Sequence, residues 1–184
     1  TYFTAATGKI NVSTGSCISG TWLGNVSTDW NTASNWCGAA VPTSSTDVVI
    51  PSGTAFAPTI ASGTTAVCRD ITINTGATLT LANSATSLLN VSGDFDNDGT
   101  LTQGASSKIS FVGNVAQNIF GNSTTSFTNL TISNNTAAVS ISVNINVSGT
   151  FSVGTGAIVT PAATAVINSS AAAGTISGTG TVQV

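Results

Sequence analysis

The sequence predicts an all-β fold, specifically a right-handed parallel β-helix, or β-solenoid, with about 19 residues in each coil. Three observations support this prediction: a composition rich in β-branched residues, short alternating runs that end at polar turns, and an internal repeat. Val, Ile and Thr favour the pleated surface of a strand. No segment repeats its apolar residues at the 3.6-residue period of a helix, so we expect short strands throughout.

Charge is scarce in this chain, and its scarcity excludes several classes of function. Only 5% of the 184 residues are charged, with three Lys or Arg, six Asp and no His. A nucleic-acid interface needs a cationic surface, and a His-based triad or a His-ligated zinc site needs His. No pair of carboxylates suited to acid–base catalysis is evident either. We therefore expect a protein that is not an enzyme and binds no nucleic acid.

Two regions of the chain differ in composition. Residues 1–46 hold all three Trp, the single Tyr and two of the three Cys. Residues 47–184 consist of short apolar–polar alternations, such as Ile-Thr-Ile at 71–73, separated by Gly, Asn, Ser and Thr. Such runs are typical of short strands joined by turns. We therefore predict an N-terminal cap in 1–46 and a solenoid in 47–184.

The tryptophans have two possible roles. The terminal coil of a solenoid exposes strand edges, and large apolar side chains are needed to cover them. Trp22, Trp30 and Trp36 are therefore expected to form the cap. The alternative is an aromatic platform on which a sugar stacks.

A repeat of about 57 residues is found when the chain is compared with itself. The segment Asn-Val-Ser-Gly-x-Phe begins at Asn90 and again at Asn146, and flanking apolar residues stay in register. Two units, residues 68–126 and 127–184, cover most of the predicted solenoid. The apolar runs of each unit fall into three groups, which gives the coil of about 19 residues.

Alternation within the runs predicts which residues form the core, and parallel stacking predicts an exposed edge at the last coil. Successive side chains of a strand point to opposite faces. The residues expected to point inward are Ile73, Leu81, Val91, Ile132 and Val147. Coils should stack in parallel at about 4.8 Å, which leaves a bare edge at the last coil. We expect further repeats of the same chain, or end-to-end neighbouring subunits, to cover that edge.

Motifs in the N-terminal region and the first repeat follow a recognisable order. They are Trp22-Leu23-Gly24, Ser27-Thr28-Asp29-Trp30-Asn31, Asn35-Trp36-Cys37, Val41-Pro42-Thr43, Asp47-Val48-Val49-Ile50-Pro51, Cys68-Arg69-Asp70-Ile71-Thr72-Ile73 and Gly76-Ala77-Thr78-Leu79-Thr80-Leu81. This order resembles the recurring module of large secreted, adhesin-like surface proteins of the Bacteroidetes group, over about residues 21–184. The resemblance implies parallel β-helix coils, export to the cell surface by type IX secretion, and a role in adhesion or extracellular scaffolding.

The resemblance also bears on the three cysteines. An exported chain is expected to use Cys in disulfides, and without His or a Cys-x-x-Cys motif a zinc site has too few ligands. Cys37 and Cys68 both lie in the resembling region, which favours a Cys37–Cys68 disulfide with Cys17 unpaired. A Cys17–Cys37 disulfide is the main alternative, and buried free thiols are a third possibility.

An acidic segment matches the start of a calcium-binding loop. Asp94, Asp96 and Asp98 alternate before Gly99, and Ca²⁺ prefers several carboxylate oxygens arranged in this way. However, Ala105 occupies the position at which such a loop carries a bidentate Glu, and the second repeat has no acid here. We predict a strand that turns at Asp98-Gly99, with a calcium site as the alternative and no other cofactor.

The function expected from the sequence is therefore a non-enzymatic structural or adhesive module of a secreted or cell-surface bacterial protein. The alternative is a solenoid that binds a ligand, either a surface glycan or ice. Outward pairs such as Thr100 and Thr102 suit a flat threonine array, but at the 57-residue offset they correspond to Ala157 and Val159, which predicts a broken array. No segment approaches the roughly 18 apolar residues of a membrane span.

Overall fold

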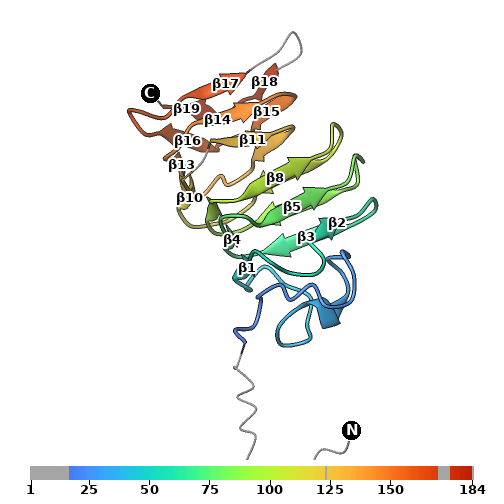
Figure 1. Ribbon diagram of the computed structural model, residues 1–184. Coiled ribbons are helices and arrows are strands. Elements are labelled where there is room, and N and C mark those ends of the chain that lie inside the picture. The colour runs from blue at the N-terminus through green and yellow to red at the C-terminus, as the bar shows by residue number, and fades with distance from the viewer. Residues whose placement is uncertain (1–16, 123, 170–174, 184) are drawn as a thin grey trace, which may run out of the picture.

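The computed structural model describes residues 17–122, 124–169 and 175–183. These residues form a parallel β-solenoid of about six coils, with about 22 residues per coil, which stack from the N-terminal to the C-terminal end (Figure 1). The one helical element among them is a 3-10 turn, η1 (Ala33–Asn35). No helix in this part of the chain is both long enough and apolar enough to cross a membrane. The prediction of an all-β parallel solenoid is confirmed.

Three strands make up one coil, and each contributes to a different face of the stack. The first face is the seven-stranded sheet of β1 (Val48–Ile50), β4 (Ile71–Ile73), β7 (Phe95–Asn97), β10 (Gln117–Phe120), β13 (Val139–Ile141), β16 (Ile158–Pro161) and β19 (Thr181–Val182). The second face is the six-stranded sheet of β3 (Thr65–Cys68), β6 (Leu88–Val91), β9 (Lys108–Phe111), β12 (Leu130–Ile132), β15 (Thr150–Val153) and β18 (Thr175–Gly178). The third face consists of two three-stranded sheets, β2 (Thr59–Ile60), β5 (Thr78–Leu81) and β8 (Thr100–Gln103), then β11 (Thr125–Phe127), β14 (Ile145–Val147) and β17 (Ile167–Ser169).

The strand register corrects the predicted coil length. On the first face Val48 pairs with Ile71, Ile71 with Phe95, and Phe95 with Ile119. The sequence offset between paired strands varies along the stack and is largest between β15 and β18. Every offset exceeds the coil of about 19 residues that the sequence predicted, so that prediction was too short.

The 57-residue repeat explains this error. It superposes β6 on β14 and β7 on β15, so one repeat contains eight strands and not nine. Eight strands make two and two-thirds coils, so dividing the repeat by three underestimates the coil. Since eight is not a multiple of three, a strand and its copy lie on different faces. The repeat therefore preserves inward and outward positions but not neighbours in space.

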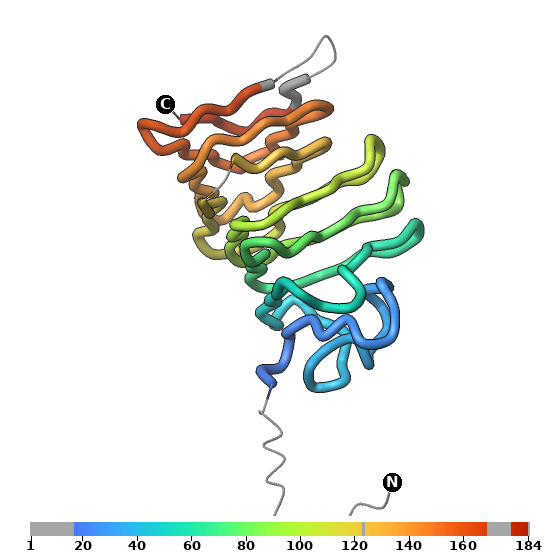
Figure 2. The backbone as a smooth tube through the Cα atoms, viewed as in Figure 1, coloured from blue at the N-terminus to red at the C-terminus, as the bar shows by residue number. Residues whose placement is uncertain are grey.

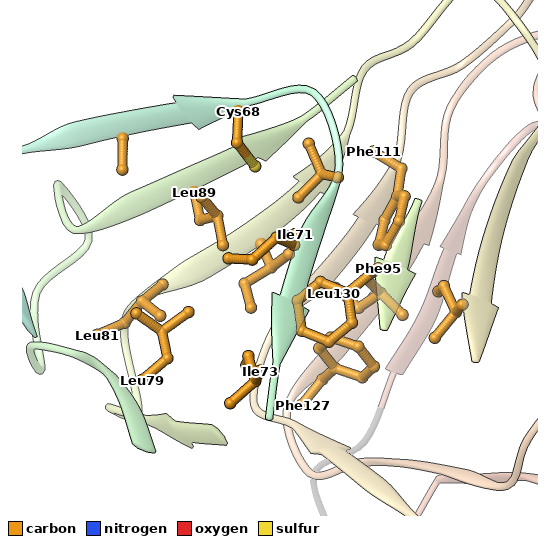
Figure 3. Close-up of a cluster of buried hydrophobic side chains, with 14 of the residues drawn as sticks. Cys68, Ile71, Ile73, Leu79, Leu81, Leu89, Phe95, Phe111, Phe127 and Leu130 are labelled. Carbon is orange, nitrogen blue, oxygen red and sulfur yellow. The ribbon is translucent and has the colours of Figure 1, made fainter. Parts of the chain in front are cut away.

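A continuous apolar core fills the solenoid. The five residues expected to point inward are all at most 1% exposed: Ile73, Leu81, Val91, Ile132 and Val147. Phe95 packs against Phe111 and Phe127 with ring centroids 6.2 and 5.7 Å away (Figure 3). Each such side chain contributes about 1.5–3 kcal/mol when buried. Because few ion pairs form among the residues that the structure describes, this core is their main source of stability.

Residues 17–46 cover the N-terminal end of the stack (Figure 2). The Trp22 N–H donates to the Val49 carbonyl (2.8 Å) and the Trp30 N–H donates to the Thr59 carbonyl (3.1 Å), so β1 and β2 have backbone partners on this side. The three indole rings are at most 1% exposed, and Trp36 meets Trp22 and Trp30 edge to face. The tryptophans therefore cap the core. A sugar-stacking platform is ruled out because it needs an exposed ring.

Candidate functional site

The third face carries an array of threonines. Thr59 pairs with Thr80 and Thr80 with Thr102, while Thr78 pairs with Thr100. All five side chains are half-buried or exposed. The apolar residues that alternate with them are buried on β5, and Leu101 on β8 is half-buried. The reason for expecting a broken array was wrong, because the 57-residue offset compares β8 of the third face with β16 of the first.

The third face is interrupted in the middle of the stack, between β8 and β11. Within the sheets, β8 pairs with β5 and β11 pairs with β14, and Figure 1 shows β8 and β11 apart. The first and second faces continue across the same coils. Both β8 and β11 are therefore edge strands, and an edge strand presents backbone groups without a sheet partner. An open groove of about 760 Å³ lies at this break.

Neutral polar side chains line this groove, which we call the β8–β11 groove. They include Thr102, Gln103, Ser126, Thr128, Asn146 and Asn168. Half-buried Leu101 and Ile167 add apolar surface, and none of the lining residues is charged. Amide and hydroxyl groups both donate and accept hydrogen bonds, so the groove suits a ligand that carries both kinds of group.

Gln103 connects the two sides of the break. Its Oε1 accepts from the Thr128 N–H (3.0 Å), and its Nε2 donates to the Asn129 carbonyl (2.9 Å) and the Ser107 carbonyl (2.9 Å). The Thr128 hydroxyl in turn donates to the Gln103 carbonyl (2.9 Å). These bonds replace strand pairing at one end of the groove and hold its shape.

A ladder of polar side chains forms the opposite wall of the groove. Ser126, Asn146 and Asn168 occupy matching positions of β11, β14 and β17. Asn168 Nδ2 donates to Asn146 Oδ1 (3.0 Å), and Asn146 Nδ2 lies 3.4 Å from Ser126 Oγ. An Asn side chain has two N–H donors and two acceptor sites, so part of each amide stays available to a ligand.

Charged residues gather at the corner between the second and first faces. Arg69 donates from Nε to Asp47 Oδ1 (2.5 Å) and from its terminal nitrogen to the other carboxylate oxygen. This contact holds the pKa of Asp47 below its ordinary value. A second open groove, of about 640 Å³, lies at this corner, and Val112 and Val115 on its rim are exposed. Because both side chains of the ion pair are about half exposed, it contributes little to stability.

The structure does not bring the three candidate calcium ligands together. Asp94 Oδ1 accepts from the Asn118 N–H (2.7 Å) and Asp98 Oδ1 from the Asn122 N–H (2.7 Å), so both link one coil to the next. Asp96 points outward from β7 between them. In the part of the chain that the structure describes, no group of three Asp or Cys side chains could hold a metal.

The cysteine pairing favoured by the resemblance was wrong. Cys17 and Cys37 form the disulfide, with a Cα–Cα distance of 5.8 Å. The backbone causes this pairing, because the Cys37 N–H donates to the Thr21 carbonyl (2.8 Å) and holds residues 17–21 beside it. Cys68 lies at the end of β3, where its side chain points into the core and is completely buried as a free thiol (Figure 3).

Three amide side chains that shape the fold and the groove were not recognised from the sequence. Asn35 and Gln117 are at most 2% exposed, and Gln103 is half-buried. Gln117 donates to the carbonyls of Val91 (3.0 Å) and Gly93 (2.7 Å) and so links successive coils. For the two glutamines the rarity of Gln in this chain was the available signal, since amides are kept where backbone groups need partners.

The fold and its surface define a capped parallel β-solenoid with an uncharged lateral groove. Residues 21–126 match the model of a domain family of unknown function, DUF8693, and the chain belongs to this family. The match spans the cap and the strands through β10, together with the start of β11. Searches of curated proteins and of solved structures gave no match. The family has no assigned function, so the resemblance to secreted Bacteroidetes proteins stays a prediction.

Proposed function

We propose that the chain is a non-enzymatic structural and adhesive module that acts outside the cell, as part of a secreted or cell-surface bacterial protein. The observation that carries this proposal is the architecture itself. Parallel pairing joins each coil to the next on two uninterrupted faces, and the tryptophan cap closes the N-terminal edge. Such a stack is a rigid, extended body with long lateral surfaces, which suits a scaffold or an adhesive surface.

The cysteine chemistry supports an extracellular location. Disulfides form and persist in oxidising environments, and the Cys17–Cys37 bond lies in the cap, where Cys17 is exposed. Export by type IX secretion, which the sequence resemblance implies, belongs to the same proposal. The remaining cysteine is buried and so is protected from unwanted exchange.

The surface chemistry supports binding in preference to catalysis. The described residues include no His, and their carboxylates are tied to Arg69 or to backbone N–H groups, or stand alone on a strand. General acid–base catalysis needs a positioned group of this kind that is free to take up a proton, and this arrangement does not favour one. What that surface does offer is hydroxyl and amide groups in regular rows.

Labelling of intact cells tests the proposal. Antibodies raised against the purified chain should label unpermeabilised cells of the source bacterium or detect the protein in the culture medium. Protease treatment of intact cells should remove the surface signal, while a cytoplasmic marker protein stays unlabelled and uncleaved. A signal that emerges only after permeabilisation would contradict an extracellular role.

An adhesion assay tests the second part of the proposal. Beads that carry the folded chain should be retained under flow on at least one of three surfaces, coated with mucin, cellulose or a neutral β-glucan. Beads that carry heat-unfolded chain serve as the control. Equal retention of folded and unfolded chain, or no retention on any of the three, would remove adhesion from the proposal.

Ligand binding by the third face is the second candidate function, and the β8–β11 groove favours it. A glycan fits this face better than ice does. The threonine array spans only β2, β5 and β8, and beyond the break Ser126, Asn146 and Asn168 take the outward positions. A flat array that matches an ice plane would have to continue across this break.

A further inference from the structure

We propose that the third face binds a neutral polysaccharide and that the β8–β11 groove is its anchoring site. This inference rests on the proposed extracellular role and names the class of ligand that the adhesive surface would take. The ligand is a chain of uncharged sugar units that lies across the break between the two sheets.

The groove is preformed. Gln103 and Thr128 join its two sides through hydrogen bonds of 2.9–3.0 Å between side chains and backbone. The floor includes Phe127, which is 1% exposed and packed into the core. Binding to such a site orders few additional side chains, which lowers the entropic cost of association.

The hydrogen-bonding groups of the groove match those of sugar hydroxyls. A hydroxyl donates one hydrogen bond and accepts others, as the amides of Asn146 and Asn168 and the hydroxyl of Thr102 also can. The ladder uses one donor of Asn168, together with one donor and one acceptor site of Asn146, which leaves a second donor on each amide for a ligand. Leu101 and Ile167 offer apolar surface for the C–H face of a sugar ring. Sites for small ligands combine apolar walls with a few oriented polar groups in the same way.

The absence of charged residues from the lining of the β8–β11 groove favours an uncharged polymer as the ligand. No Lys, Arg or Asp lines the groove, and the charged residues of the described chain that form an ion pair lie at the corner between the second and first faces. A phosphate-bearing or nucleic-acid ligand needs cations, and an acidic polysaccharide would also be repelled by the net charge of −3.

The edges of β8 and β11 could in principle pair with an extended peptide. Such a peptide needs backbone contact along the strand. Gln103 and Thr128 already occupy one end of both edges, where the Thr128 hydroxyl donates to the Gln103 carbonyl. The groove therefore leaves too short a free edge for strand addition, and side-chain recognition of a polysaccharide is the better match.

Affinity gel electrophoresis of the whole chain tests this inference. Native gels are cast with dextran, laminarin or galactomannan, and a gel with alginate serves as the acidic comparator. At least one neutral polysaccharide should retard the chain, and alginate should not. Retardation by alginate alone, or by none of the four, would overturn the inference.

Variants locate the site. The double substitution N146A/N168A removes the ladder and should weaken retardation at least tenfold. Asn90→Ala removes an outward amide from β6 on the second face and should leave retardation unchanged. Thr102→Arg extends a long side chain over the groove from an exposed position and should also weaken binding, so the test does not depend on the double variant alone.

Each outcome of the variant series bears on the inference directly. Thermal unfolding monitored by circular dichroism confirms that every variant is folded. Equal retardation of the parent chain and both groove variants would place binding elsewhere and overturn the assignment. Because surface labelling of cells does not depend on the groove, failure here is distinguishable from failure of the proposed extracellular role.

Discussion

Four hydrogen bonds converge on the buried side chain of Asn35. Its Oδ1 accepts from the N–H groups of Val26 (3.0 Å) and Ser27 (3.1 Å). Its Nδ2 donates to the Ser27 hydroxyl (3.1 Å) and to the Asp29 carbonyl (3.0 Å). One side chain therefore gives partners to two backbone N–H groups and one carbonyl of the cap loop, and its own amide is fully paired, as buried polar groups require.

Replacing Asn35 should unfold the cap at lower denaturant concentration. Asn35→Ala leaves the N–H groups of Val26 and Ser27 and the Asp29 carbonyl without this partner, which costs about 1–3 kcal/mol for each group that water cannot reach. We expect the free energy of unfolding to fall by at least about 2 kcal/mol, measured by urea denaturation. Asn25→Ala, an exposed position in the same loop, is the matched control and should change little. Equal effects of the two substitutions would contradict the role of Asn35.

Asp96 should make the protein slightly less stable at neutral pH. Partial burial, and then the neighbouring carboxylate of Asp98, raise the pKa of Asp96 above its ordinary value of 3.8. Between that value and the raised one, the folded state binds more protons than the unfolded state, so stability falls as pH rises through this window. The destabilisation is fully present above the raised pKa and disappears below the ordinary value.

Asp96→Asn removes this effect. The variant should melt at a higher temperature than the parent at pH 7. The corresponding gain in the free energy of unfolding should be at most about 0.5 kcal/mol, as is usual for surface substitutions. The difference should vanish near pH 3, where the parent carboxyl is protonated in both states. A difference that is the same at both pH values would show that ionisation of Asp96 is not its cause.

The Cys68 thiol should be unreactive in the folded protein. Complete burial, and then the charges of Asp70 and Asp47, raise the pKa of the Cys68 thiol well above its usual range. Since the thiolate is the reactive form, a thiol reagent should find no reactive group in the native chain and one in urea. Three thiols after unfolding without reductant would show that the Cys17–Cys37 disulfide is absent.

At the scale of elements, the cap depends on the disulfide that anchors its first residues. The Cys17–Cys37 bond closes a loop with a sequence separation of 20. A cross-link of this span typically contributes about 2–4 kcal/mol. Cys17→Ser should lower the free energy of unfolding by about that amount, measured by urea denaturation without reductant. Ser19→Ala, also exposed, is the control, and an equal loss in both variants would contradict this role of the disulfide.

The positions of the strands in the sequence could be predicted much better than the pairing of each strand with its neighbours in space. Period-2 alternation in runs such as Leu79-Thr80-Leu81 identifies the buried side chains correctly, because inward and outward positions are a local property of a strand. The coil length is a property of pairing across space. The repeat from Asn90 to Asn146 contains eight strands, so it measures a non-integral number of coils and gives the wrong spatial neighbours.

The groove could not be predicted for the same reason. Whether β8 pairs with β11 depends on how two coils meet, and nothing in the local pattern of Thr100–Gln103 marks it as an edge strand. Its one unusual feature is Gln103, which sits at an outer strand end and bonds to the next coil. The disulfide likewise depended on a backbone contact between Cys37 and Thr21 that spacing alone does not reveal.

At the scale of the whole molecule, the parallel register determines every surface feature. Stacked coils place outward residues of consecutive coils beside one another, which creates the threonine array and the Ser126–Asn146–Asn168 ladder. A change of one or two residues in coil length would move these side chains out of alignment and remove both the array and the ladder. The neutral lateral face, and the binding proposed for it, therefore depend on a coil of about 22 residues.

Engineered disulfides test this register most directly. Thr59 pairs with Thr80 in neighbouring strands about 4.8 Å apart, which is within the Cα distance that a disulfide spans. The shorter coil expected from the sequence would instead place Thr59 beside Thr78. In the observed register Thr78 lies two residues before Thr80 on β5, a displacement of about 6–7 Å along the strand, which puts it too far from Thr59 for a disulfide.

The measurement is non-reducing peptide mapping of two double variants after mild oxidation. Thr59→Cys/Thr80→Cys should yield a cross-linked peptide pair, and Thr59→Cys/Thr78→Cys should not, while Cys17–Cys37 stays intact in both. All three positions are half-buried and outward-facing, so the oxidant reaches the engineered thiols of both variants equally well. A cross-link in the second variant and none in the first would contradict the observed register and with it the lateral face.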